Sequence, residues 1–212
     1  MSKLILHTSG STKEPKEVVH DWSLINECAK RSIEELGLTS SSIVLNVLPY
    51  NVIGYFTISA YPAIIAGATL INANFDPYSY INLFKKYKPT HIALINRHYE
   101  VLKNTKEFHN LDMSCVEYMT TGSDRVTQEF IDTFKKLGVK KIGNWYGMTE
   151  FPPPVMIAYD SLEFTKIVVS HSVSYIEGEC VVNGIPTGDI FVNGKFSHRK
   201  QSANRTTWKT DF

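Results

Sequence analysis

The stretch "SIVLNVLPYNVIGYFTISAYPAIIAGATLIN" (residues 42–72) carries the pattern that decides the fold class. Residues 42–49 form an apolar run of strand length, residues 52–66 have the length of a helix, and residues 68–72 are again strand-like. Parallel strands need a crossover connection of about this length, usually a helix. The segment therefore predicts an α/β unit, and the interruptions at Pro62 and Gly67 argue against a membrane span.

The same alternation of strands and helices continues on both sides of this segment. Further helical or strand-like runs are found at residues 24–36, 76–87, 90–95, 115–122 and 126–137. From about residue 155 onward, short β segments bounded by glycine follow one another. We therefore predict an α/β domain over residues 1–154, with a mostly parallel sheet flanked by helices, and a small β-rich subdomain over residues 155–212.

The composition is that of an ordinary globular protein. Of 212 residues, 43% are hydrophobic and 20% charged, and 22 basic against 21 acidic residues give a formal charge of +1. This balance argues against dedicated binding to nucleic acid or to a membrane surface. Cys28, Cys115 and Cys180 are widely spaced, which indicates reduced thiols rather than a disulfide framework. Because the amino terminus also lacks a signal-peptide pattern, we predict a cytoplasmic protein.

A loop rich in small hydroxyl residues lies near the amino terminus. The stretch "HTSGSTKEPKEVVH" (residues 7–20) joins two strand-like runs and holds two serines, two threonines, a glycine and two lysines. Backbone amides, hydroxyls and a lysine are donors that bind phosphate groups. Because the spacing differs from the P-loop pattern, an ordinary hydrophilic turn explains the composition too. His7 and His20 bracket the loop and are interpreted as strand-end packing or surface residues.

A second loop of interest is "NWYGMTE" (residues 144–150), which combines two aromatic rings with a glycine, a threonine and a glutamate. An aromatic ring can stack on a base, a threonine can donate to a phosphate, and a glutamate can hold a divalent cation. A surface turn with a packed aromatic residue is the alternative. Ligands of open α/β sheets bind where strands end, so the turns at 8–15, 120–124 and 144–150 are expected to share one rim.

Together the two loops resemble the signatures of the adenylate-forming (AMP-binding) superfamily, which includes acyl-CoA synthetases, nonribosomal peptide synthetase adenylation domains and luciferases. "TSGSTKEPKEVVH" resembles its phosphate-loop signature, and "YGMTE" matches its second signature, YGxTE. "LPYNVIGYF" is similar to an acyl-pocket segment, "TTGSDRV" to a turn beside adenine, "TGDIFVNG" to a strand motif, and "TTWKTDF" to the segment with a ribose-binding aspartate. The resemblance covers nearly the whole chain and implies an acyl-CoA synthetase-like fold.

The resemblance also implies a site for ATP or AMP and Mg²⁺, with coenzyme A as a further substrate of some members. Lys16, Thr149 and Glu150 would act in catalysis, Thr149 at the α-phosphate and Glu150 at Mg²⁺. Asn51 and Gly54 would border the pocket for a small carboxylic acid. The remaining nucleotide contacts, including stacking of the Tyr146 ring on adenine, would come from Thr8, Ser9, Gly10, Ser11, Thr12, Gly122, Ser123, Tyr146, Gly147 and Asp211. The implied reaction is attack of the carboxylate on the α-phosphorus of ATP, which gives acyl-AMP and pyrophosphate.

Several positions depart from the family pattern. Lys13 and Glu17 stand where the family has glycine, and Glu17 would place a negative charge beside the phosphates. Asn51 replaces a histidine. The glycine expected before Asp211 is missing, and Asp189 is the competing candidate for the ribose contact.

The family's region before the phosphate loop and its carboxy-terminal lid domain are both expected to be absent. Two functions therefore stay open. The first is an adenylate-forming enzyme core, acting alone or with a partner chain. The second is a catalytically inactive nucleotide-binding module with a regulatory or scaffold role. A truncated core would expose apolar faces, so a homo-oligomer or a partner chain is expected to cover them.

Overall fold

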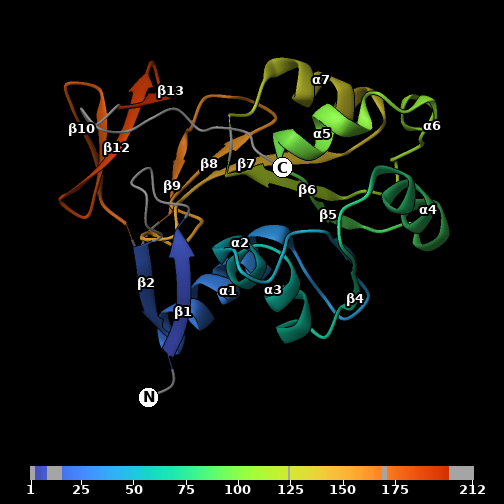
Figure 1. Cartoon of the computed structure of the whole chain (residues 1–212), viewed down its shortest axis with the longest axis horizontal. Helices are drawn as coiled ribbons and strands as arrows, with labels where there is room; N and C mark the ends of the chain where they lie inside the picture. Colours follow the sequence, from blue (N-terminus) through green and yellow to red (C-terminus); the bar gives the residue numbers. More distant parts are fainter. Residues whose placement is uncertain (1–2, 9–15, 124, 169–170, 201–212) are drawn as a thin grey trace.

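The computed structural model describes residues 3–8, 16–123, 125–168 and 171–200, and its centre is one large sheet (Figure 1). The strands of this sheet are β3 (Ile43–Asn46), β4 (Thr69–Asn72), β5 (His91–Ala93), β6 (Tyr118–Gly122), β7 (Lys141–Tyr146), β8 (Met156–Tyr159) and β9 (Lys166–Ile167). Their order is β4-β3-β5-β6-β7-β8-β9, and the neighbours from β4 to β7 are parallel. Only β8 and β9, at one edge, join in antiparallel orientation. The sheet is therefore mostly parallel, which confirms the predicted fold class.

Helices cover both faces of this sheet (Figure 1). One face carries α1 (Trp22–Leu36), α2 (Ile53–Thr57) and α3 (Ala60–Ile65), and the other carries α4 (Pro77–Tyr87), α5 (Asn96–Leu102), α6 (Lys106–His109) and α7 (Gln128–Lys136). The larger apolar core includes Tyr80, Phe84 and Phe130, and the second core includes Trp145. Within the described ranges, no helix has the length and apolarity needed to cross a bilayer.

Local sequence signals set several helix ends. Asp76 caps α4 through a 2.8 Å hydrogen bond from a backbone amide of its first turn. Gly37 ends α1 in the left-handed conformation, with a φ of 66°. The single helix predicted over residues 52–66 is instead two helices, α2 and α3. Ser59 leaves the helical region with a φ of −129°, and Pro62 has no N–H to continue the hydrogen-bond ladder across this junction.

Helix α1 is anchored to the sheet by one carboxylate. Glu35 accepts hydrogen bonds from Tyr118 of β6 at 3.2 Å, from Tyr159 of β8 at 2.7 Å and from Lys141 of β7 at 3.3 Å. Lys166 of β9 donates a further hydrogen bond to the same carboxylate. The Glu35 side chain is 10% exposed, so this cluster holds a nearly buried charge against four strands.

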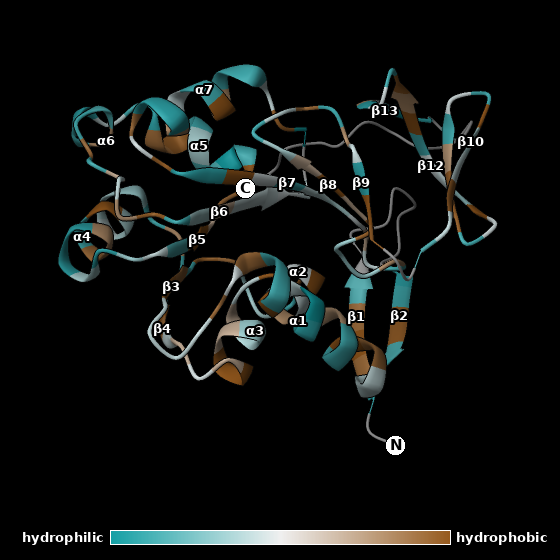
Figure 2. Ribbon diagram, turned by 180° about the vertical axis from the view of Figure 1, so that it is seen from behind, coloured by the Kyte–Doolittle hydropathy of each residue, from teal (hydrophilic) through white to brown (hydrophobic). Residues whose placement is uncertain are grey.

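The amino-terminal strands β1 (Lys3–Thr8) and β2 (Lys16–Asp21) form a separate two-stranded antiparallel sheet. Figure 2 shows a hydrophobic stretch within each of these strands. Successive side chains point to opposite faces, so Ile5 is exposed between the buried Leu4 and Leu6. Leu4 and Leu6 face inward and pack with Ile25 and Ile53. The sequence predicted both strands but not their pairing, and this hairpin does not belong to the parallel sheet.

The carboxy-terminal strands form a four-stranded antiparallel sheet of β10 (Val173–Ile176), β11 (Glu179–Val182), β12 (Ile185–Val192) and β13 (Lys195–Arg199). Its inner face packs Cys180, Val182 and Phe191 against Tyr146 and Val155. The predicted domain boundary at residue 155 differs from the change of sheet, because β8 and β9 still extend the seven-stranded sheet. Short glycine-bounded β segments do not reveal which sheet they join.

Candidate functional site

The loop that leaves β7 is closed by its own backbone. The carbonyl of Tyr146 accepts a hydrogen bond from the Val155 amide at 2.9 Å. Met148 and Phe151 exchange two backbone hydrogen bonds, of 2.9 and 3.1 Å. Thr149 and Glu150 therefore form the tip of this loop, residues 147–154, with Thr149 half-buried and Glu150 exposed.

Two glycines of the predicted site lie where backbones approach closely. A Cβ on Gly147 would be 2.8 Å from Cα of Pro153, which holds the loop tight. A Cβ on Gly122 would be 2.2 Å from the carbonyl oxygen of Trp145, and Gly122 has a φ of +152°. Gly122 pairs with Trp145 in the β6–β7 ladder, so Gly122 and the exposed Ser123 stand beside the end of β7.

One hydrogen bond joins the hairpin to this loop. Nε2 of His20 in β2 lies 2.6 Å from the carbonyl oxygen of Thr149. A carbonyl only accepts, so Nε2 carries the hydrogen and donates it. His20 is 7% exposed, and 129 positions separate the two residues along the chain. The strand that follows the first signature loop therefore contacts the second signature loop directly.

The hairpin presents Lys16 and Glu17 to opposite faces. Side chains two residues apart share a face of a strand, so Lys16 lies in the same row as the buried His20. Lys16 is exposed and sits about 13 Å away along β2, as the first residue of that strand. Glu17 pairs with His7 in the outer row. The Glu17 carboxylate therefore points to the face opposite that of Lys16, because one residue of register moves a side chain to the other face; its effect on bound phosphates stays a prediction.

The Tyr146 side chain is packed against residues of the β-rich subdomain. Its hydroxyl donates to Oδ2 of Asp189 at 2.8 Å, and its ring makes edge contacts with Phe164 and Phe191 at 6.1 and 5.1 Å between centroids. Burial raises the pKa of Tyr146, so the hydroxyl stays a donor. Tyr146 is 9% exposed, which limits the ring surface open to a ligand in this conformation. Stacking on adenine stays a prediction.

Asp189 has no free oxygen for a ribose. Arg199 donates to Oδ1 through Nε at 2.6 Å and to Oδ2 through Nη2 at 2.9 Å, and Tyr146 completes the shell. The Asp189 side chain is 3% exposed. Its hydrogen bonds with Arg199 raise the pKa of that guanidinium further. In this structure Asp189 is therefore the counter-ion of Arg199, and the ribose contact of Asp211 stays a prediction.

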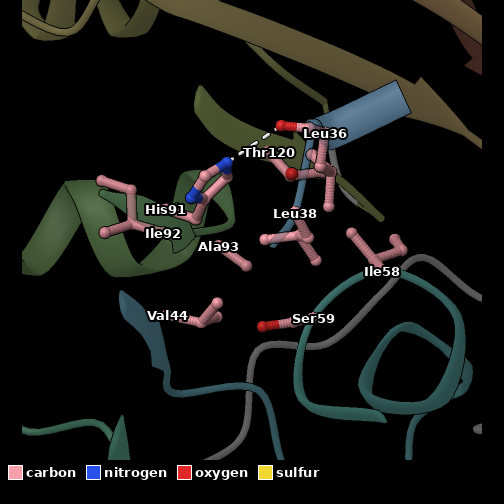
Figure 3. A pocket seen from close by; sticks show the side chains of 9 residues that line it. All are labelled: Leu36, Leu38, Val44, Ile58, Ser59, His91, Ile92, Ala93 and Thr120. Carbon is pink, nitrogen blue, oxygen red and sulfur yellow. Dashed lines mark hydrogen bonds between the residues drawn. The ribbon is translucent and has the colours of Figure 1, made fainter. Parts of the chain in front are cut away.

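The segment predicted to border the acid pocket begins α2. Asn51 is exposed in the turn before the helix, and Gly54 is buried, with the position of a Cβ 3.5 Å from Ile58. Beyond Ile58 lies a cavity of about 10 Å³, drawn in Figure 3. Its lining is Leu36, Leu38, Val44, Ile58, Ser59, His91, Ile92, Ala93 and Thr120. This volume suits one water molecule, and the lining contains none of the predicted nucleotide residues.

Part of the predicted site lies outside the described residues. Ser9, Gly10, Ser11, Thr12 and Asp211 belong to this group, as does the substituted Lys13. Thr8 ends β1, where its backbone pairs with Lys16. The sequence predicts His20 as a strand-end packing or surface residue and assigns no role to Arg199. The signal that could have pointed to the contact of His20 is its place as the last residue of the first signature.

The metal-binding capacity of the site rests on one carboxylate. Among the described residues, no group of three or more histidine, cysteine, aspartate or glutamate side chains could enclose an ion. Glu150 is exposed at the loop tip and takes part in no ion pair within the described ranges. Mg²⁺ is commonly held by one or two carboxylates together with substrate phosphates and water. Glu150 also acts electrostatically on Arg199, and a single exposed carboxylate of this kind fits Mg²⁺ brought in with a nucleotide.

A family model describing AMP-binding enzymes matches residues 3–196, and the chain belongs to this family. It is 28% identical over 151 residues to the indoleacetate–CoA ligase of Aromatoleum aromaticum, a match that covers 71% of this chain and 29% of the ligase.

Solved structures show the same fold. O-succinylbenzoate coenzyme A synthetase (MenE) from Bacillus subtilis, in complex with ATP and magnesium ion, superimposes with a TM-score of 0.74 at 19% identity, over 91% of this chain and 48% of MenE. The N-terminal domain of FACL13 from Mycobacterium tuberculosis gives a TM-score of 0.76 at 19% identity, over 92% of this chain and 60% of that domain. The acyl-CoA synthetase-like fold is thereby confirmed, and the chain spans about half the length of MenE.

Proposed function

We propose that this chain is the nucleotide-binding part of an adenylate-forming ligase, which activates a small carboxylic acid with ATP to give acyl-AMP and pyrophosphate. The observation that carries the proposal is the 2.6 Å contact between His20 and Thr149. It joins His20, the last residue of the first family signature, to the tip of the loop that carries the second. Two segments more than 120 residues apart thus meet at one place in a chain of the AMP-binding family.

The proposed roles follow the order of the phosphates. Lys16 and the hydroxyl-rich segment of residues 8–12 bind the β- and γ-phosphates, and Thr149 donates to the α-phosphate. Glu150 would hold Mg²⁺, which would supply positive charge at the departing pyrophosphate. Adenine and ribose are proposed to contact Gly122, Ser123, Tyr146, Gly147 and Asp211. The chain's own contribution is then mostly to orient the carboxylate and the α-phosphorus for in-line attack.

The acid is proposed to enter beside α2, with Asn51 and Gly54 at its border. Gly54 leaves room where any side chain would project toward Leu48 and Ile58. The name of the indoleacetate–CoA ligase supports an acid of this general kind and coenzyme A as the acceptor of the acyl group. We propose both as starting points for a substrate screen.

The deciding experiment is carboxylate-dependent exchange of labelled pyrophosphate into ATP, with a panel that includes indoleacetate and o-succinylbenzoate. Exchange above the acid-free background supports the proposal. Glu150→Gln should abolish it by removing the metal ligand, and Glu107→Gln, an exposed glutamate on α6, is the matched control. Calorimetry with ATP and Mg²⁺ on the same proteins separates binding from turnover. Binding without exchange for every acid would favour the inactive nucleotide-binding module.

We also propose that a partner chain or a second copy of this chain covers part of the surface. Tyr50 is 76% exposed beside α2, and Ile64 is 56% exposed on α3. Size-exclusion chromatography with light scattering tests this, and a stable monomer with no partner requirement in the exchange assay would refute it. The unpaired Cys28, Cys115 and Cys180 fit the cytoplasmic location proposed from the sequence.

A further inference from the structure

The contact between His20 and Thr149 connects to the main chain rather than to a side chain. The imidazole Nε2 donates to the carbonyl of Thr149, and His20 itself is 7% exposed. Among the described residues, this is the only hydrogen bond that reaches Thr149 or Glu150 from outside their own loop. The tip of the loop is therefore held through its backbone, and this contact does not occupy the side chain of Thr149 or Glu150.

The hydrogen bond between His20 and Thr149 also fixes the distance between the β1–β2 hairpin and the loop that follows β7. The hairpin is a separate two-stranded sheet, and the loop of residues 147–154 follows β7 of the seven-stranded sheet. Among the strands that the structure describes, no pairing links the hairpin to the seven-stranded sheet. Lys16 lies on the same face of β2 as His20, so fixing His20 against Thr149 also fixes the row that holds Lys16.

We propose that His20 is a positioning residue for nucleotide phosphates: it holds the tip with Thr149 and Glu150 at a fixed register against the hairpin that carries Lys16. This inference rests on the proposed function for its ligand, the polyphosphate of Mg²⁺-bound ATP. Loss of the hydrogen bond should leave the adenine end of the site unchanged, because Gly122 ends β6 in its ladder with β7, Ser123 directly follows it, and His20 takes no part in that ladder.

The test compares four single variants. His20→Leu removes the donor and keeps an apolar volume, whereas His20→Asn keeps a polar group that is too short to reach the Thr149 carbonyl. His20→Gln places an amide N–H close to the position of Nε2 and should restore the contact. His7→Gln is the matched control, because His7 is an exposed histidine in the outer row of the same hairpin.

Affinity is measured by calorimetry for Mg²⁺-ATP and for adenosine, which has no phosphate. His20→Leu and His20→Asn should bind Mg²⁺-ATP about tenfold more weakly, as expected for one lost hydrogen bond, and bind adenosine as the wild type does. His20→Gln and His7→Gln should match the wild type for both ligands. Equal losses for ATP and adenosine, or no rescue by His20→Gln, would overturn the proposal. If His20→Leu does not fold, His20→Asn decides.

Hydrogen exchange separates this inference from the proposed function. Backbone amides of residues 148–151 should exchange faster in His20→Asn than in the wild type, His20→Gln or His7→Gln, with no ligand present. If the wild-type protein bound neither ATP nor adenosine, the proposed nucleotide function would fail. The tether would still be supported by faster exchange in His20→Asn and refuted by unchanged exchange.

Discussion

Loss of either member of the Asp189–Arg199 pair should destabilise the β-rich subdomain, and loss of the arginine should cost more than loss of the aspartate charge. The Asp189 side chain is 3% exposed and that of Arg199 is 33% exposed. Arg199→Met strands a buried carboxylate whose remaining donor is the Tyr146 hydroxyl, and breaking a buried pair in this way costs about 3–5 kcal/mol. Asp189→Asn keeps one acceptor and leaves a guanidinium that reaches water, so it should cost about 1.5–3 kcal/mol, the value of one charge-assisted hydrogen bond.

The assay is urea unfolding followed by far-ultraviolet circular dichroism, with linear extrapolation to zero denaturant. Lys200→Met is the matched control, because Lys200 forms a neighbouring ion pair with Glu179 but is 48% exposed, and such pairs contribute about 1 kcal/mol or less. The double variant Asp189→Asn/Arg199→Met should be more stable than Arg199→Met alone, since it strands no charge. Equal effects of Arg199→Met and Lys200→Met, or a larger effect of Asp189→Asn, would refute the reasoning.

Two glycines and one carboxylate give further testable outcomes. Gly122→Ala should lower stability by about 1–3 kcal/mol, because its Cβ would fall 2.2 Å from a backbone oxygen; an unchanged midpoint of thermal unfolding would contradict this. Gly54→Ala should keep or raise that midpoint, since the nearest atom is a methyl carbon at 3.4 Å and alanine favours a helix by about 1 kcal/mol; a clear loss would show that the helix cannot accept a Cβ. Burial opposes ionisation of Glu35, but hydrogen bonds from Lys166 and Tyr159 and nearby positive charge lower its pKa overall. The contribution of Glu35 to the free energy of unfolding should be complete above the unfolded-state pKa of about 4.3 and be lost as the pH falls through the lower folded-state pKa. Glu35→Gln should therefore make the free energy of unfolding depend less on pH in the acid range. An unchanged dependence would contradict the assignment.

The elements that could be predicted from the sequence are those set by short-range signals. Asp76 with the following proline, and Gly37 after an apolar stripe, act within one turn of the helix, so their letters suffice. The run of residues 52–66 has helical length, but its division depends on the backbone at Ser59, which apolar periodicity does not record. For the part of the chain after residue 155, the sequence predicts that strands occur but does not predict which sheet each strand joins.

The candidate site shows the same limit more sharply. The residue types and the family resemblance predict phosphate and metal chemistry for Lys16, Thr149 and Glu150; the family match supports the resemblance, and the roles of these three residues stay predictions. The contacts that arrange them join distant segments: His20 reaches Thr149 across 129 positions, and Asp189 reaches Tyr146 across 43. A single sequence contains no spacing rule for such pairs, because the tertiary path between them sets the distance.

The tight approach of Gly147 to Pro153 has a consequence for how this protein can change by mutation. Two of the three atoms that a Cβ on residue 147 would meet are the nitrogen and Cα of Pro153, and these belong to the main chain. Replacing the proline cannot remove Cα or the backbone nitrogen, so a damaging allele at codon 147 has no simple second-site suppressor at codon 153. Gly143 differs, because its nearest neighbours are the Tyr118 hydroxyl and the Trp145 indole nitrogen, which are side-chain atoms. A genetic screen should therefore recover suppressors of Gly143→Ala at codons 118 or 145, and only true revertants of Gly147→Ala.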